Sequence, residues 1–173
     1  MSNKEIGLVH LLQKSASGLS SAGAVVSTAA FVFMVVLTVA EVILRSVFGK
    51  STLVASEYSG YLLAAMIYLG MGFSFREEAH IRITFLKGRL SGRIGWVLEL
   101  WCYAFACVLC VLSTIFIWDM VLTSFERGMQ AYTVAETPLY IPQACLLIGM
   151  AVFTFQVIAG LVNLIFHVSP REF

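Results

Sequence analysis

The chain has 173 residues, of which 60% are hydrophobic and 12% are charged, and its mean hydropathy is +0.90. A water-soluble domain of this size does not need so much apolar surface, so the composition predicts a membrane protein. The 11 Lys and Arg residues nearly balance the 10 Asp and Glu residues, which leaves a net charge of +1. Such a chain has no long-range attraction for nucleic acid, and a nucleic-acid partner is not expected.

The first element is expected over residues 4–15, where apolar and polar side chains fall on different faces of a helix. Ile6, Val9 and Leu12 share one face, and most charged or polar residues of the segment lie elsewhere. This pattern predicts an interfacial helix that lies on the bilayer surface. A tail that is ordered only by its neighbours is the open alternative.

Four long apolar segments follow, over residues 22–47, 53–75, 94–124 and 139–167. Each is long enough for the ~20 helical residues that a membrane crossing requires. Their apolar runs are continuous and do not alternate with polar residues, which excludes barrel strands. The first segment begins too late and runs too long for a removable signal, so it is expected to stay as an anchor. The sequence therefore predicts an all-α integral membrane protein with four transmembrane helices in a single membrane domain, residues 1–173.

The basic residues predict which side of the membrane each connection faces. With both termini in the cytoplasm, the connection 76–93 lies inside, and the connections 45–52 and 127–138 lie outside. The positive-inside rule favours this orientation because most basic residues are then cytoplasmic. The inner side holds Lys4, Lys14, Arg76, Arg82, Lys87, Arg89, Arg93 and Arg171, whereas the outer side holds Arg45, Lys50 and Arg127.

The inner connection 76–93 predicts a second interfacial helix. Ile83, Leu86 and Leu90 can share one apolar face, while neighbouring basic side chains reach the lipid headgroups. An ordinary basic loop is the open alternative. Tryptophans near the ends of the third span fit the aromatic enrichment of membrane interfaces. The side chains predicted at the lipid interface are Lys87, Arg89, Arg93, Trp96, Trp101 and Trp118.

Three charged residues at the outer end of the first hairpin predict a structural clamp. Glu41 and Arg45 are four residues apart with the acid first, which is the favourable order for a helical pair. Arg45 could instead reach Glu57 at the start of the second span. Either pair neutralises charge where the lipid begins, and an unpaired ion there costs on the order of several kcal/mol. A contact of Arg45 or Glu57 with a partner subunit is compatible with the clamp.

No residues point to catalysis, a cofactor or a metal. The four cysteines lie inside predicted spans and are interpreted as small core side chains. The histidines map to the inner edge of the membrane or beyond it, whereas a haem between helices needs them at membrane depth. No enzymatic activity is expected. The residues concerned are Cys102, Cys107, Cys110, Cys145, His10, His80 and His167.

The spans also lack the features of a self-sufficient transporter. Glu41 lies near the end of its span, and Glu99 and Asp119 lie near opposite ends of theirs, so none marks a proton relay at mid-depth. No span has a Gly or Pro break at its centre, as the discontinuous helices of transporters do. The residues Ser56, Gly60 and Ala64, spaced by four, instead predict a face for close helix packing, within the bundle or toward another protein.

An ordered series of short motifs runs from residue 38 to residue 90. It comprises Glu41-Val-Ile-Leu-Arg45 with Phe48-Gly49, then Glu57, then Tyr68-Leu-Gly70, then Arg76-Glu-Glu-Ala-His80-Ile81-Arg82-Ile83. In this order, spacing and four-span setting, the series resembles the small membrane subunit, DctQ-type, of tripartite ATP-independent periplasmic (TRAP) transporters. Ser46, Ala55, Ser56 and Thr84 stand where that family more often has an aromatic residue, a Trp, an acid and an Asp.

The resemblance implies a small, non-catalytic scaffold subunit in the bacterial or archaeal inner membrane. Its partners would be membrane lipids, a large TRAP membrane subunit with the sodium and substrate sites, and a periplasmic substrate-binding protein. The cargo would be an organic acid such as sialic acid or a C4-dicarboxylate. The alternative is an autonomous four-helix proton-coupled exporter or channel. Residues expected in structural or partner contacts are Glu41, Arg45, Ser56, Glu57, Gly60, Ala64, His80 and Arg82.

Overall fold

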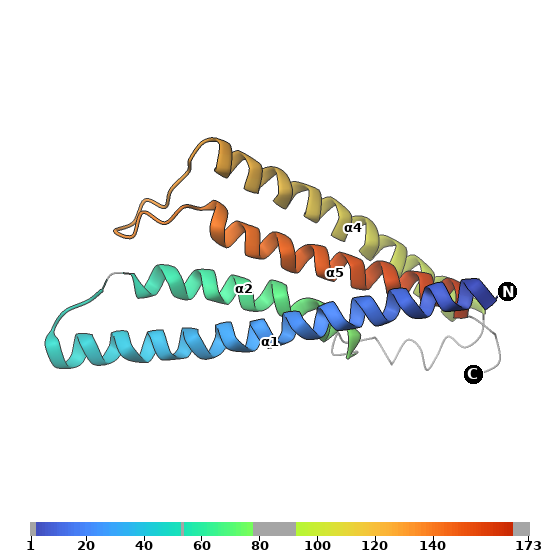
Figure 1. The fold of residues 1–173 in the computed structure, drawn as a ribbon, viewed down its shortest axis with the longest axis horizontal. Coiled ribbons are helices and arrows are strands. Elements are labelled where there is room, and N and C mark those ends of the chain that lie inside the picture. The colour runs from blue at the N-terminus through green and yellow to red at the C-terminus, as the bar shows by residue number, and fades with distance from the viewer. Residues whose placement is uncertain (1–2, 53, 78–92, 168–173) are drawn as a thin grey trace.

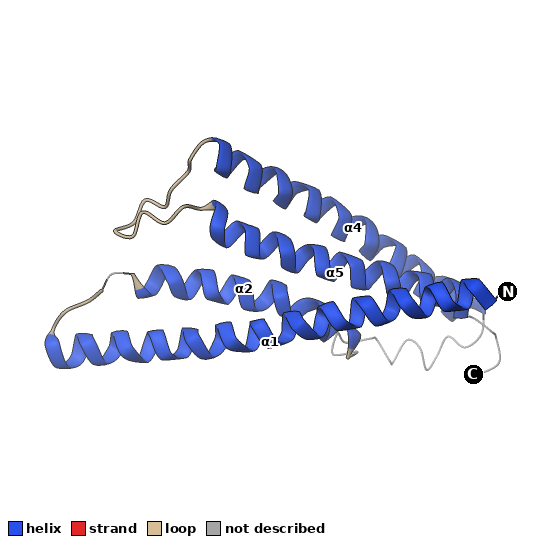
Figure 2. Cartoon of the chain, viewed as in Figure 1, coloured by secondary structure: helices blue, strands red, loops and turns tan. Residues whose placement is uncertain are grey.

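The structure, a computed structural model, describes residues 3–52, 54–77 and 93–167, with side chains for 11–52, 54–77 and 94–166. The described chain is built from the helices α1 (Asn3–Phe48), α2 (Ala55–Arg76), α4 (Arg93–Glu126) and α5 (Tyr140–His167). These ranges contain no strand (Figure 2). All four helices are long and apolar enough to cross a membrane. The predicted all-α fold with four spanning helices is therefore confirmed.

Local sequence explains where the helices stop. Gly49 follows α1 with a φ of +62°, and Gly128 follows α4 with a φ of +58°. Glycine adopts this left-handed conformation without steric cost and commonly ends a helix. Pro142 stands in the first turn of α5, where its missing N–H costs no helical hydrogen bond. The interiors of the described helices contain no other proline, so their apolar runs stay helical.

The helices form two hairpins, α1–α2 and α4–α5, and α5 packs against the first hairpin. Helix α5 contacts all three other helices, and α1 packs chiefly on α2. The start of α1 and the end of α5 lie at the same end of the bundle (Figure 1). The opposite end holds Phe48 and the connection 127–139; we call it the outer end, after the predicted orientation. Which side of the membrane each end faces stays a prediction.

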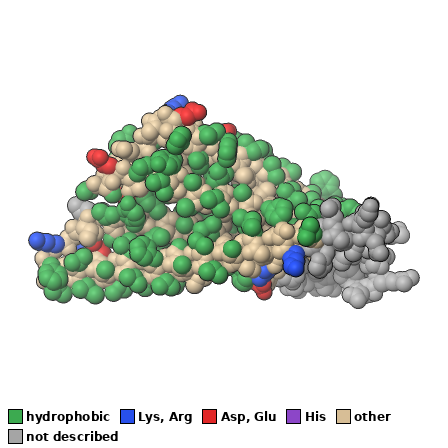
Figure 3. Space-filling model, viewed as in Figure 1, with side chains coloured by type: hydrophobic (Ala, Val, Ile, Leu, Met, Phe, Trp, Pro, Cys, Tyr) green, Lys and Arg blue, Asp and Glu red, His purple; other side chains and the backbone are tan. Residues whose placement is uncertain are grey.

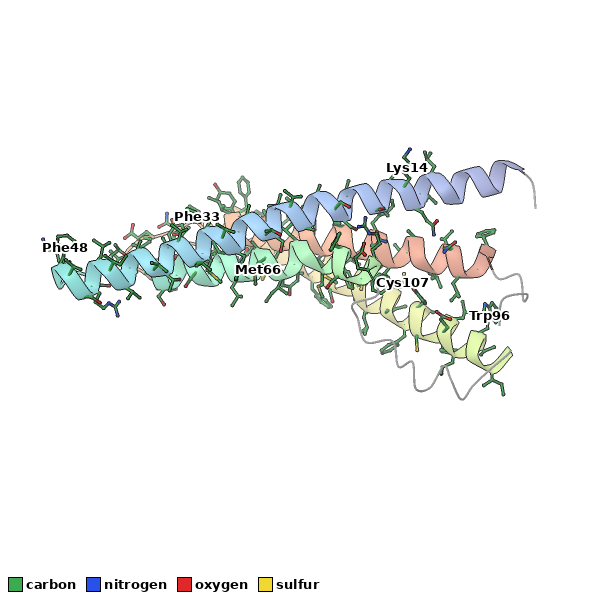
Figure 4. The ribbon with its side chains drawn as sticks, turned by 90° about the horizontal axis from the view of Figure 1, so that it is seen from below. Lys14, Phe33, Phe48, Met66, Trp96 and Cys107 are labelled. Carbon is green, nitrogen blue, oxygen red and sulfur yellow. The ribbon has the colours of Figure 1, made fainter. Side chains whose placement is uncertain are left out.

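Helix α4 crosses the bundle obliquely. It diverges from α1 toward the outer end in Figure 1 and toward Trp96 in Figure 4. Most of its surface is consequently free of contact with the other described helices, and hydrophobic side chains cover much of the visible face in Figure 3. Large apolar side chains on this surface include Trp101, Phe105 and Phe116, exposed by 65–70%. In a bilayer such a surface faces lipid or another membrane protein.

Two glycines permit the closest helix crossings. A Cβ added to Gly23 of α1 would lie 2.6 Å from the Leu69 carbonyl oxygen of α2. A Cβ added to Gly149 of α5 would lie 2.5 Å from the Tyr68 carbonyl carbon on the same turn of α2. The middle of α2 is thus held between two helices that approach its backbone. The hydrophobic effect does not drive helices together in lipid. Small residues at such crossings instead allow the close van der Waals packing that does.

The buried core lies among α2, α4 and α5. Its centre is Val157, which is fully buried, with Cys110, Met150 and Phe153 around it. Phe75 of α2 packs edge to face on Phe153 of α5, with ring centroids 5.7 Å apart. Edge-to-face contacts of this kind are worth about 0.5–1.5 kcal/mol beyond area burial.

Helix α1 differs from the prediction at its start. The sequence predicts an interfacial helix over residues 4–15 and a separate span that begins at residue 22, whereas the structure has one helix from Asn3 to Phe48. The intervening serines do not interrupt it because they find partners: Ser21 donates to the Ser17 carbonyl within the helix, and Ser20 donates to Gln156 of α5. At 1.5 Å per residue α1 is ~69 Å long, more than twice the ~30 Å hydrocarbon layer, so part of it extends beyond that layer or the helix tilts strongly.

Candidate partner-contact site at the outer end of the first hairpin

Glu41 is the centre of a polar cluster that closes the first hairpin. Its Oε1 accepts from Arg45 Nη2 at 3.1 Å and from the Ser51 hydroxyl. Its Oε2 accepts from the Thr52 backbone N–H at 3.2 Å and from the Thr52 hydroxyl at 2.6 Å. The carboxylate is therefore saturated with donors, and it joins the last turns of α1 to the connection that follows. Hydrogen bonds to a charged acceptor are stronger than neutral ones.

Arg45 pairs with Glu41 in the structure, and Glu57 makes other contacts. Glu57 Oε1 accepts from the Tyr61 hydroxyl at 2.8 Å, and Oε2 accepts from the Thr133 hydroxyl. The structure thus settles the choice that the sequence left open: Arg45 bonds Glu41, and the Glu57 carboxylate is taken by Tyr61 and Thr133. The clamp on the first hairpin consequently runs through Glu41 and the connection, not through Arg45 and Glu57.

Glu57 instead links the two hairpins at the outer end. Thr133 belongs to the connection 127–139, and Thr137 of the same connection lies 3.4 Å from the Tyr58 hydroxyl. The connection is also bonded to itself, with the Ala131 N–H donating to the Thr137 carbonyl at 2.9 Å. A fully exposed Tyr132 stands near its tip. This link was not predictable from the sequence, because nothing in the chain order pairs residue 57 with residue 133.

The predicted packing face on α2 is open at its outer end. Ser56 and Gly60 are exposed, and Ala64 is half-buried. A Cβ added to Gly60 would meet no atom of the described chain within 4 Å. The spacing left open whether this face packs within the bundle or against another protein. Within the described chain, no helix packs closely against Ser56 or Gly60. Packing toward another protein stays a prediction for these two residues.

Arg76, at the inner end of α2, makes contacts with α1 that the sequence did not predict. Its guanidinium donates to the Ser17 carbonyl and hydroxyl and to the Ser21 hydroxyl, at 2.6–3.1 Å. It also pairs with Glu77 at 2.8 Å and lies over the Phe73 ring. From the sequence, Arg76 was expected only as an inner basic residue and as a member of the motif series. The run of serines in an otherwise apolar helix was the available signal, because serines in lipid-spanning helices commonly bond across helices.

Several predicted contact and interface residues lie outside the described part of the chain. These are His80, Arg82, Lys87 and Arg89, and the side chain of Arg93. The predicted second interfacial helix lies in the same range. Within the described residues, no group of three His, Cys, Asp or Glu side chains lies close enough to hold a metal ion.

The tryptophans of α4 lie toward the two ends of the helix. Trp101 is 70% exposed and Trp118 is 53% exposed, and their 17-residue separation corresponds to ~26 Å along the axis. Trp96 buries its indole N–H, which has no hydrogen-bond partner among the described residues. This spacing is compatible with aromatic side chains at both interfaces of a ~30 Å hydrocarbon layer. The interface assignment itself stays a prediction.

Four apolar helices of spanning length, with charged clusters toward their ends, define a multi-pass membrane protein. A family model described as "Tripartite ATP-independent periplasmic transporters, DctQ component" matches residues 34–167, which is most of the chain. The chain belongs to this family and is a component of TRAP transporters. The resemblance drawn from the motif series is thereby confirmed. No curated protein and no solved structure matches the chain.

Proposed function

We propose that this chain is the small, non-catalytic scaffold subunit of a sodium-coupled, binding-protein-dependent secondary transporter for organic acids. The carboxylates considered are of the sialic acid or C4-dicarboxylate kind. The observation that carries the proposal is the family match over residues 34–167, which covers the outer part of α1 and all of α2, α4 and α5. The chain would lie in the bacterial or archaeal inner membrane.

The placement of charge supports a scaffold role. On α2, Glu57 and Arg76 are separated by ~29 Å along the helix, and on α4, Glu99 and Asp119 are separated by ~30 Å. These separations match the ~30 Å hydrocarbon layer, so α2 can keep Glu57 and Arg76, and α4 can keep Glu99 and Asp119, near the two interfaces. A helix arranged in this way offers apolar surface to lipid and to a partner across the full membrane depth.

The division of labour follows from this arrangement. The large membrane subunit would supply the sodium and substrate sites, and the periplasmic binding protein would deliver the organic acid. This chain would enlarge and anchor the membrane part of the complex. The connection 127–139, which Glu57 holds in place, would face the binding protein at the outer surface.

Reconstitution into liposomes tests the proposal. Uptake of a radiolabelled organic acid should need this chain, the large membrane subunit and the binding protein of the same organism, together with an inward sodium gradient. Liposomes with this chain alone should show no uptake and no efflux. Proton-coupled efflux or sodium-driven uptake by the chain alone would contradict the scaffold role and favour an autonomous exporter or channel.

A further inference from the structure

A cavity of about 350 Å³ lies between α1 and α2 at the outer end. We call it the outer groove. Seven of the nine residues that line it carry a hydroxyl or a charge, although apolar atoms make up most of the exposed lining. The residues that line it are Thr38, Glu41, Val42, Arg45, Ser46, Ser51, Ala55, Ser56 and Ser59.

The two charged side chains of the outer groove differ in how many of their polar atoms form hydrogen bonds. The Glu41 side chain is 12% exposed and both of its oxygens accept two hydrogen bonds each. The Arg45 side chain is 67% exposed, and its bonds to described residues use Nη2 alone, on Glu41 and Ser51. The Nε and Nη1 groups of Arg45 are thus available to another acceptor. Each of these two groups can donate a single charge-assisted hydrogen bond to a carboxylate oxygen.

The groove continues along α2 as an open helix face. Ser56 lines the groove, and Gly60 one turn further has no neighbour within 4 Å of an added Cβ. Leu63 and Ile67 extend the same face toward the membrane centre and are 44% and 50% exposed. A face that is small at one end and aliphatic along the rest allows a second helix to approach its backbone closely.

We propose that the outer groove and the Ser56–Gly60 face receive a transmembrane helix of the large membrane subunit, and that an acidic side chain near the outer end of that helix binds Arg45. This inference rests on the proposed function, since that subunit is the occupant. A phospholipid can also place its phosphate on Arg45 and its acyl chains on Gly60, but the family is a component of tripartite transporters, which favours a protein as the occupant. A helix uses both, and its polar side chains can bond the hydroxyls of Ser46 and Ser59.

The first test blocks the approach surface in the full complex. Gly60→Leu should reduce co-purification of the large subunit at least 10-fold, while the chain alone loses neither helicity by circular dichroism nor thermal stability. Gly18→Leu is the matched control, because Gly18 is an exposed helical glycine with equally open surroundings. Undiminished co-purification with Gly60→Leu would overturn the inference and leave the scaffold function standing. Failure of the unsubstituted chain to co-purify with the large subunit would overturn both.

The second test identifies the occupant. Ser56→Cys is labelled with a membrane-impermeant maleimide in nanodiscs, and the native cysteines are measured as background in the unsubstituted chain. Labelling should fall at least 5-fold when the large subunit is present, in phosphatidylcholine alone and with added phosphatidylglycerol. Tyr132→Cys, at the exposed tip of the connection 127–139, should be labelled equally with and without the large subunit. Protection of Ser56→Cys that follows the anionic lipid and not the large subunit would overturn the inference in favour of a phospholipid.

Discussion

Helix α2 is enclosed in its middle and open at its outer end. Around Tyr68 and Leu69 the backbone is approached by Gly149 and Gly23, so closely that even a methyl group on either glycine would overlap it. At Gly60, more than two turns away, an added Cβ would meet no described atom within 4 Å, and Ser56, one turn further, is exposed. The two regions therefore differ in how closely neighbouring helices approach them.

This difference separates residues that hold the bundle together from residues that remain for a partner. Small side chains in a membrane helix permit close packing, but they do not say which helix will use it. In the middle of α2, helices of the same chain occupy the close-packing surface, and substitutions there should unfold the chain. At the outer end, under our proposal, a helix of the large membrane subunit occupies this surface, and substitutions there should leave the fold of the chain intact. The following substitutions test this contrast.

Gly149→Leu should have the largest effect. The new side chain would meet the Tyr68 backbone, which cannot move aside as a flexible side chain can. Overpacking of this kind should cost about 3 kcal/mol or more. Thermal unfolding in detergent, followed by circular dichroism, measures the loss. Gly60→Leu in the same assay should be neutral or slightly stabilising, since leucine favours a helix by about 0.5–1 kcal/mol over glycine. Equal destabilisation by the two changes would contradict the contrast.

Arg76→Gln should have the next largest effect, at the inner end. The change removes donors to Ser17 and Ser21 and so weakens the contact between α1 and α2. Bonds between membrane helices are worth about 1–2 kcal/mol in model systems, and a loss of that size is expected in the same unfolding assay. Arg76→Lys keeps a cation but not the planar set of donors. Its stability should therefore lie between that of Arg76→Gln and that of the unsubstituted chain. An unchanged unfolding temperature for Arg76→Gln would show that this cluster does not stabilise the bundle.

Glu41→Gln should loosen the connection after α1 without unfolding the chain. A neutral amide is a weaker acceptor than a carboxylate for Thr52 and Arg45. Hydrogen exchange at the Thr52 amide should accelerate several-fold. The matched control is Glu126→Gln at the exposed end of α4, which should leave exchange at Thr52 unchanged. Unaltered exchange in Glu41→Gln would mean that Glu41 does not hold the connection.

Thr133→Val should have the smallest effect. The substitution keeps the side-chain shape and removes the hydroxyl that donates to Glu57. A spin label at Tyr132→Cys should report faster motion of the connection 127–139, with an unchanged unfolding temperature. Thr28→Val is the control, because Thr28 bonds only its own helix, at the Ala24 carbonyl. Equal label mobility in both variants would show that the link to Glu57 does not order the connection.

Much of the fold was predictable because it depends on properties that are local in sequence. Length and hydropathy defined four spans, and the motif series from Glu41 to Ile83 indicated the family that the family model then showed. The pairing of Arg45 was not predictable, because Glu41 and Glu57 are both within reach of it along the chain. The Arg76 cluster was missed for a related reason: its partners lie 55 and 59 residues earlier in the chain.

Sequence alone determined that this protein crosses the membrane as helices, because uninterrupted apolar runs leave backbone groups no other way to be satisfied in lipid. It also indicated that α2 carries small residues for close packing. Only the tertiary structure decided which of those residues are already used. Packing depends on which helices meet, and here α1 and α5 enclose the middle of α2 and leave Ser56 and Gly60 uncovered.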